Sequence, residues 1–275
     1  MPELPEVETV RRSLATQLIG LRITGCPHLD WPRTIAAPAA AQFCALLQDR
    51  PITAVERRAK YLILRLDQGE ALVIHLRMTG QLTVQPAGTL PDSHTHVIFD
   101  LDDGRRLRFR DARKFGRVWL LDAPGLALLH RHLGPEPLDE ALTAAEFALL
   151  LRRRKGALKP ILLNQQVIAG LGNIYVDEAL WQARLHPLRT VPSLTDDDVQ
   201  QLFQAIQSVL RSAIEHRGTT FGQYVDGLGQ AGANQHHLNV YGRQGEPCSR
   251  CGTPIEKLTV AQRGTHVCPH CQLRP

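Results

Sequence analysis

Apolar residues follow a helical period at the start of the chain. Four of them fall on one face when residues 5–19 are drawn as a helix: Val7, Val10, Leu14 and Leu18. Pro5 suits the first turn of such a helix, where no amide donor is needed. Glu6 and Glu8 bring negative charge to the positive end of its dipole. The pattern therefore predicts an amphipathic N-terminal helix.

Between residues 52 and 122 the pattern changes to short runs of strand-forming residues. The clearest runs are residues 61–66, 71–76, 96–101 and 105–110. Asp102-Asp103-Gly104 separates the last two runs and is a sequence typical of hairpins. Several short strands at this spacing predict a β-sandwich or a barrel.

A helical part follows the segment 133–137, whose glycine and two prolines predict a hinge. Helices are predicted near residues 143–153, 159–166, 173–184 and 196–216. Residues 218–235 contain five glycines and little periodicity. We expect a mobile loop there, because long loops inside compact proteins often serve as functional lids.

The composition is that of a globular protein, with 43% apolar and 21% charged residues. No apolar run approaches the roughly 20 residues that cross a bilayer. The segment from Met1 to Glu8 is rich in proline and acids, unlike a secretory signal. We therefore expect a cytoplasmic protein without a membrane anchor.

Lysine and arginine outnumber the acids by 32 to 27, and the excess is concentrated in two stretches. These stretches are residues 105–117 and 152–159. Such clusters suit a polyanion such as nucleic acid, although either one alone also fits an ordinary solvated surface.

Four of the six cysteines form two Cys-x-x-Cys pairs with sixteen residues between them: Cys248, Cys251, Cys268 and Cys271. Four thiolates satisfy a tetrahedral zinc ion, and each pair supplies two sulfurs from one turn. A redox pair or an iron–sulfur cluster is the alternative. The spacing predicts one structural zinc and a β-hairpin between the pairs. Cys26 and Cys44 are expected to be separate core thiols.

The N-terminus has the chemistry of a nucleophile. Removal of Met1, expected before a small residue, would leave Pro2 with a free secondary amine. An α-amino group has a pKa of about 8, so it is neutral far more often than lysine at pH 7. Glu3 beside it could donate or accept a proton. Taken alone, the same residues also fit a plain helix entry.

Five motifs occur in order from the first residue to the last, and together they carry a family resemblance. They are Met-Pro-Glu-Leu-Pro-Glu-Val-Glu (1–8), Arg-Arg-Ala-Lys-Tyr-Leu (57–62), Asp-Ala-Arg-Lys-Phe-Gly (111–116), Gly-Leu-Gly-Asn-Ile-Tyr (170–175) and the terminal cysteine pattern. The chain closely resembles the bacterial formamidopyrimidine-DNA glycosylases, also called 8-oxoguanine-DNA glycosylases.

The resemblance implies an α+β multidomain fold. Residues 1–132 would form the catalytic domain, an N-terminal β-sandwich with a leading helix. Residues 133–235 would form a helix–two-turn–helix DNA-binding domain with the mobile loop. Residues 236–275 would form the zinc finger.

The resemblance also implies a bifunctional enzyme that removes oxidised purines from duplex DNA and nicks abasic strands by β,δ-elimination. Pro2 matches the Schiff-base nucleophile, and Glu3 matches the acid that assists base loss and opening of the sugar. Lys60 matches a strand lysine linked to phosphate contact and β-elimination. Arg263 matches the finger arginine that grips phosphate and is tied to δ-elimination.

Further positions match residues that contact DNA. Met78, Arg113 and Phe115 match those that fill the hole left by a flipped base. The other matches are His94, Lys155 and Asn173, with Lys159 near enough to join them. A Gly-x-Gly turn that opens a helix at Asn173 independently suits an anion. Glu6 matches a residue near the flipped base, although its place in the first helical turn already explains a carboxylate there.

The chain departs from the family pattern at three positions. Ala112 stands where proline is common, Lys114 where a second arginine is common, and Arg77 where glycine often precedes the methionine. The loop around residues 222–235 is also unusual, which leaves the lesion preference open.

Two other functions remain at this stage. One is the sister endonuclease VIII type, which acts on oxidised pyrimidines with the same nucleophile and zinc end. The other is a zinc-ribbon protein that binds DNA without cutting it. The residues at 4–8 and the set Met78, Arg113 and Phe115 favour the purine enzyme. We expect DNA with an oxidised purine or an abasic site as the partner, no organic cofactor and a monomer.

Overall fold

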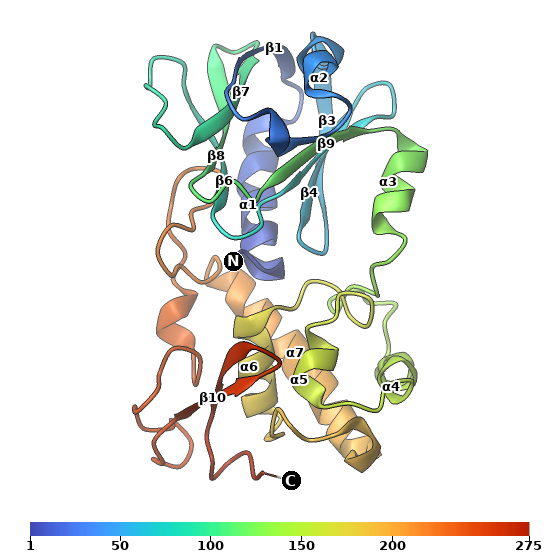
Figure 1. Ribbon diagram of the computed structural model, residues 1–275, viewed down its shortest axis with the longest axis vertical. Coiled ribbons are helices and arrows are strands. Elements are labelled where there is room, and N and C mark those ends of the chain that lie inside the picture. Colours follow the sequence, from blue (N-terminus) through green and yellow to red (C-terminus); the bar gives the residue numbers. More distant parts are fainter. Residues whose placement is uncertain (275) are drawn as a thin grey trace. The chain divides into compact units, whose positions relative to one another are not determined.

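The computed structural model describes residues 1–274, which form two compact units. The first unit holds Met1–Arg131 together with His216–Gln235. The second holds His132–Glu215 and the chain from His236 onward. Figure 1 labels most of the elements of both units and colours the chain along the sequence.

Nine strands of the first unit form one continuous sheet in the order β2-β9-β5-β4-β3-β1-β7-β8-β6. Their bounds are β1 Arg22–Leu29, β2 Ile35–Ala37, β3 Arg50–Arg58, β4 Tyr61–Leu66, β5 Ala71–His75, β6 Gly80–Pro86, β7 Thr95–Leu101, β8 Arg105–Asp111 and β9 Arg117–Leu121. The predicted hairpin at Asp102-Asp103-Gly104 is confirmed as β7–β8, and the runs 61–66 and 71–76 form the antiparallel pair β4–β5. Of the neighbouring pairs, β2 and β9 run parallel.

The sheet has two halves that share one core. One half holds strands β2, β9, β5, β4 and β3, and the other holds β1, β7, β8 and β6. Strands β1 and β3 join the halves through only two registered pairs, from Arg22 and Ile23 to Pro51 and Arg50. Alternate side chains of both halves are buried in a single apolar cluster, with Leu62 and Ile74 from one half and Phe99 from the other. Two sheet halves with inward-facing apolar residues give the sandwich-like packing that the strand pattern predicted.

Helix α1 (Leu4–Leu18) completes this core, and its predicted apolar face is confirmed. Val7, Val10, Leu14 and Leu18 are all fully buried. The helix packs against β3, β4 and β6. Two shorter helices, α2 (Ala40–Leu46) and α3 (Ala123–His130), complete the helices of the first unit as described.

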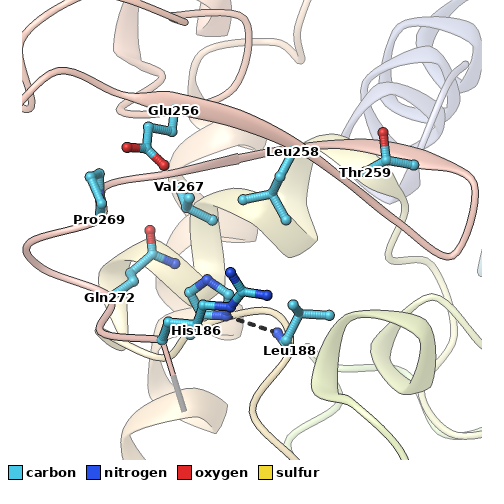
Figure 2. Close-up of a pocket in the computed structure, with 9 residues that line it drawn as sticks. His186, Leu188, Glu256, Leu258, Thr259, Val267, Pro269 and Gln272 are labelled. Atoms are coloured by element: carbon cyan, nitrogen blue, oxygen red, sulfur yellow. Dashed lines mark hydrogen bonds between the residues drawn. The ribbon is translucent and has the colours of Figure 1, made fainter.

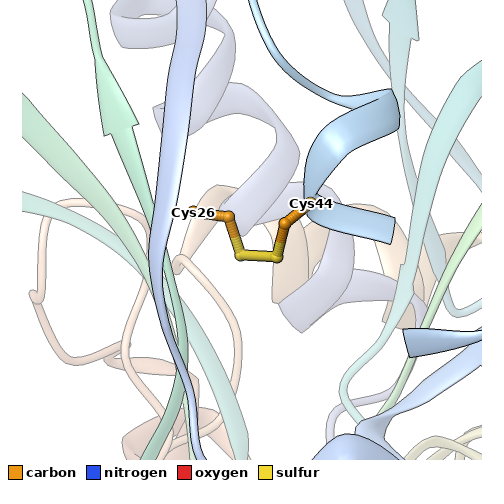
Figure 3. Close-up of a disulfide and its surroundings, with 2 residues drawn as sticks. All are labelled: Cys26 and Cys44. Atoms are coloured by element: carbon orange, nitrogen blue, oxygen red, sulfur yellow. A yellow bond between two sulfur atoms is a disulfide. The ribbon is translucent and has the colours of Figure 1, made fainter. Parts of the chain in front are cut away.

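Cys26 and Cys44 differ from the expectation of two separate thiols. The structure joins them in a disulfide between β1 and α2, with their Cα atoms 5.4 Å apart (Figure 3). Their positions 18 residues apart in the sequence show no paired spacing, so only the packing of α2 on β1 brings them together.

The helices of the second unit lie where the periodicity predicted them. They are α4 Ala144–Arg152, α5 Leu158–Leu162, α6 Asn173–Gln182 and α7 Asp196–Glu215. Strands β10 (Glu256–Val260) and β11 (Arg263–Val267) form the predicted hairpin between the cysteine pairs. No helix among residues 1–274 is both long and apolar enough to span a membrane.

Residues 216–235 belong to the first unit, whereas the sequence grouped them with the helical domain. Gly227 donates its N–H to Ser13 Oγ at 2.8 Å and accepts from the Val84 N–H at 3.1 Å. A Cβ at Gly227 would lie 2.6 Å from Leu14, so only glycine allows this approach to α1. The segment is therefore hydrogen-bonded to α1 and β6 along part of its length.

Candidate active site

Pro2, Glu3 and Glu6 lie together at the start of α1. All three are buried, Glu3 and Glu6 with only 2% and 1% exposure. The Glu3 N–H donates to Glu6 Oε2 at 2.8 Å, as in a capping box. Glu6 Oε1 accepts the Thr219 N–H at 2.7 Å. The Glu6 carboxylate thus joins the N-terminal turn to residues 216–235.

Lys60 lies in the turn between β3 and β4, one residue before the strand. It is buried, and Ala59 before it has a φ of +52°. The end of β3 is tied to α1 because Arg57 Nε lies 3.1 Å from Glu8 Oε2. Glu8 also accepts from Arg11, and these guanidiniums hold the pKa of its carboxyl below the usual value although burial acts to raise it.

His75 is a residue of this region that the sequence did not single out. Burial, with the charges of Arg77 and Lys60, lowers its pKa to about 3, so its ring is neutral at pH 7. His75 Nδ1 accepts the Arg77 N–H at 3.0 Å, and its ring meets Tyr61 edge to face. A single histidine at the end of an apolar strand carries no sequence signal beyond core packing.

Met78, Arg113 and Phe115 are exposed on the loops β5–β6 and β8–β9. The Arg113 guanidinium lies over the Phe115 ring, 4.8 Å from its centre. Lys114, beside them, lies over the Trp31 ring at 4.2 Å. Two large apolar side chains and one cation exposed on loops suit insertion into a base stack.

Asp111 joins these two loops and is fully buried. Its Oδ1 accepts from Thr79 Oγ1 at 2.5 Å, and its Oδ2 accepts from the Gly116 N–H at 2.6 Å. The Arg113 N–H donates to Thr79 Oγ1 at 3.1 Å. The carboxylate at the head of the motif 111–116 therefore organises the backbone that carries the three exposed side chains.

The basic stretch 105–117 is more neutralised than its composition suggested. Arg105, Arg106 and Arg110 form ion pairs with the acids Asp103, Asp100 and Asp92. His94 is half-buried, and its backbone N–H donates to Asp92 Oδ1 at 3.1 Å. These ion pairs leave only part of the stretch as candidates for a DNA contact, and Arg113 is exposed among those candidates.

In the second unit, Asn173 is the first residue of α6 and follows the N-cap Gly172. Its Nδ2 donates to the Gly264 carbonyl at 2.9 Å. Arg263 is exposed and begins β11. The preceding Ala261 and Gln262 have φ values of +47° and +59°, the conformation of a type I′ hairpin turn.

The two candidate lysines of this unit differ in exposure. Lys155 is exposed between α4 and α5, as a DNA contact requires. Lys159 is fully buried, with Nζ 2.6 Å from Asp177 Oδ1. The expectation that Lys159 joins the surface contacts is therefore wrong for this structure.

The four C-terminal cysteines fit a zinc ion. Their sulfurs lie within 4.8 Å of one another, with separations of 4.0 Å (Cys248 to Cys271) and 3.4 Å (Cys251 to Cys268). Tetrahedral zinc with bonds of about 2.3 Å needs sulfurs roughly 3.8 Å apart. Burial acts to raise the pKa of the Cys248 thiol, but N–H donors including Arg250 and Trp181 lower it, whereas burial raises the pKa of the Cys268 thiol.

A pocket of about 310 Å³ lies beside this finger, lined from both His186-Leu188 and the hairpin (Figure 2). Among its lining residues, Gln272 donates to the Leu185 carbonyl and accepts from the Cys268 N–H. None of the predicted catalytic or DNA-binding residues lines it.

Family models match three parts of the chain. The formamidopyrimidine-DNA glycosylase N-terminal domain matches residues 1–118, and its H2TH domain matches residues 133–224. A zinc finger found in FPG and IleRS matches residues 245–274.

Whole-chain relatives and structures agree with these matches. Formamidopyrimidine-DNA glycosylases of Herpetosiphon aurantiacus and a Roseiflexus species are 54% and 52% identical, each covering 99% of this chain and 100% of the relative. The Lactococcus lactis protein in complex with DNA that contains an abasic site has a TM-score of 0.93 at 38% identity. A variant of it bound to DNA with a formamidopyrimidine lesion (Fapy-dG) has 0.93 at 37%. Both structures cover 99% of this chain and 100% of the other. The chain belongs to the formamidopyrimidine-DNA glycosylase family.

Proposed function

We propose that the protein is a bifunctional DNA glycosylase and abasic-site lyase that excises oxidised purines through a Schiff base on Pro2. The observation that carries the proposal is the start of α1, where Pro2 and the adjacent Glu3 are both buried. The family membership supports the same activity, and the named relatives cover the whole chain.

The first step replaces a bond to the base by a bond to the protein. After Met1 is removed, the neutral Pro2 amine attacks C1′ of the damaged nucleotide. The C1′–N9 bond breaks, the base leaves with the electron pair, and it takes up the proton that the Pro2 nitrogen loses as it bonds to C1′. Glu3 supplies a proton as the sugar ring opens, which leaves an iminium between C1′ and the Pro2 nitrogen.

The iminium then serves as an electron sink for strand cleavage. Loss of a proton from C2′ breaks the C3′–O3′ bond, and the 3′ phosphate leaves with the electron pair. Loss of a further proton from C4′ breaks the C5′–O5′ bond. Water finally hydrolyses the iminium and regenerates the Pro2 amine. We assign Lys60 to the first elimination and Arg263 to the phosphate released in the second.

The remaining residues hold the DNA in this proposal. Met78, Arg113 and Phe115 would fill the gap left by the flipped base, with the Arg113 guanidinium facing the orphaned cytosine. His94, Lys155 and Asn173 would bind phosphates. Glu6 would lie near the flipped base, and both of its carboxylate oxygens also accept backbone N–H groups.

The cysteines Cys248, Cys251, Cys268 and Cys271 would hold one zinc ion, which fixes the hairpin that carries Arg263. Four sulfur ligands leave no open position, so the ion's contribution is structural. Because the substrate is chromosomal DNA and the named relatives are bacterial, we place the protein in the cytoplasm.

Borohydride reduction with a labelled duplex tests the proposal. A covalent adduct should form on a duplex with 8-oxoguanine opposite cytosine, and it should disappear when Met1 is retained or a tag blocks Pro2. Salt-dependent DNA binding without an adduct would leave the non-enzymatic binding protein.

A parallel duplex with 5-hydroxyuracil separates the two lesion classes. Faster cleavage of the 8-oxoguanine duplex is expected for the purine enzyme. A strong preference for the pyrimidine lesion would instead indicate the endonuclease VIII type.

A further inference from the structure

A fully buried ion pair in the second unit takes no part in the chemistry proposed above. Lys159 Nζ on α5 lies 2.6 Å from Asp177 Oδ1 on α6, and both side chains are 0% exposed. Transfer of two charges out of water is costly, so a pair of this kind persists where further hydrogen bonds hold it in place.

Both members of the pair bind the backbone of β11. Asp177 Oδ2 accepts the His266 N–H at 2.9 Å, and Lys159 Nζ donates to the Gly264 carbonyl at 3.2 Å. Strand β11 pairs with β10 along its other edge. The ion pair thus satisfies the edge that would otherwise present unpaired backbone groups, and it fixes the strand at two alternate residues.

The Gly264 carbonyl also accepts from Asn173 Nδ2 at 2.9 Å. Gly264 follows Arg263 directly, and Asn173 begins α6, the helix that carries Asp177. The carbonyl of the residue next to Arg263 is therefore hydrogen-bonded to Asn173, and the proposed function assigns both Arg263 and Asn173 to phosphates. This contact sets the backbone at Arg263 relative to the start of α6.

We propose that Asp177 is a positioning residue for strand cleavage. Together with Lys159, it holds β11 in the place that lets Arg263 and Asn173 engage the DNA backbone at the same time. This proposal rests on the proposed function, because it takes the roles of Arg263 and Asn173 from there.

The test compares Asp177→Asn with the double variant Lys159→Gln/Asp177→Asn on a duplex with an abasic site. The double variant replaces the ion pair by an amide pair and leaves no buried charge without a partner. It therefore keeps the proposal testable if Asp177→Asn alone fails to fold. For whichever variants retain zinc and melt cooperatively, we expect KM to rise about tenfold and the share of δ-elimination product to fall by about half. Borohydride trapping at saturating DNA should change by less than about threefold, because Pro2 is untouched.

A double-mutant cycle with Arg263→Gln separates positioning from general stability. If Asp177 acts through Arg263, adding Asp177→Asn (or the amide pair) to Arg263→Gln should cause little further loss. An additive loss, or wild-type KM and product ratios in the amide-pair variant, would overturn the proposal. Asp197→Asn is the matched control, because it makes the same change at an exposed carboxylate in the first turn of α7.

Absence of a borohydride adduct with the wild-type protein would contradict the proposed function itself. That result is distinguishable from a failure of the positioning role of Asp177, in which the wild type still forms the adduct.

Discussion

At the scale of single residues, Arg77 combines backbone strain with an exposed charge. Its φ is +54°, a region that costs a residue with a side chain about 1–2 kcal/mol relative to its ordinary conformations. The strained residue lies between His75, which accepts its N–H, and the exposed Met78. Backbone strain of this kind is typical of functional positions, and the adjacent loop is the one proposed to bind DNA.

Arg77→Gly should therefore separate stability from binding. Glycine adopts this φ without the strain, although it loses more conformational entropy on folding. Because the relieved strain exceeds the entropy cost, the free energy of unfolding should rise by about 0.5–1 kcal/mol. If the guanidinium contacts one phosphate, the slope of log binding constant against log salt should fall by about 0.9. Urea unfolding and salt titrations of duplex binding measure the two effects. Tighter binding by the variant would contradict the role given to the charge.

His75 should make stability depend on pH. Its pKa is lowered to about 3 in the fold and lies near 6.5 when unfolded, so the unfolded chain takes up the proton first. The contribution of the neutral His75 ring to the free energy of unfolding is fully present above pH 6.5. It is lost as the pH falls towards 3, by about 1.4 kcal/mol per pH unit. His75→Gln should lose less stability than the wild type between pH 7 and pH 5, as measured by urea unfolding. Equal losses in both proteins would refute this assignment.

At the scale of secondary-structure elements, local patterns predicted most of the fold. The apolar period of residues 5–19, the Asp-Asp-Gly turn and the two cysteine pairs each act over a few residues, and α1, the β7–β8 hairpin and the zinc hairpin follow them. Partners distant in sequence could not be predicted. The burial of Lys159 depends on Asp177 and Gly264, and no local pattern reveals that these three residues meet.

The Cys26–Cys44 link between β1 and α2 is another contact of this long-range kind. In the chain-entropy view, a disulfide that closes about 18 residues stabilises the fold by up to about 3 kcal/mol. Cys26→Ala/Cys44→Ala should lower the unfolding free energy by up to this amount and leave nicking unchanged. Thiol titration of the denatured, zinc-free wild type should find four free thiols. Six thiols would show that the pair is reduced in solution.

At the scale of the whole molecule, the proposed reaction draws on both units. Pro2, Glu3 and Lys60 belong to the first unit, and Asn173 and Arg263 belong to the second. The chemistry of the amine needs no metal, whereas the hairpin that presents Arg263 is held by cysteines whose sulfurs fit a zinc ion.

Removal of zinc should consequently abolish productive DNA binding while the Pro2 amine stays intact. Chelation followed by metal analysis, duplex binding and nicking assays checks this expectation. Reloading with zinc should restore both activities, which controls for irreversible damage. An unimpaired nicking rate after verified zinc loss would show that the finger is dispensable.

The chain completes its first unit only with residues 216–235, after the helices of the second unit have been made. Until then the Glu6 carboxylate lacks the Thr219 N–H, and Ser13 and Val84 lack Gly227. During synthesis, which proceeds from the N-terminus, the unit that carries Pro2 is therefore begun first and completed late. A nascent chain can form the hydrogen bond from Thr219 to Glu6 only after residue 219 has been added, when helices α4 to α7 have already been synthesised.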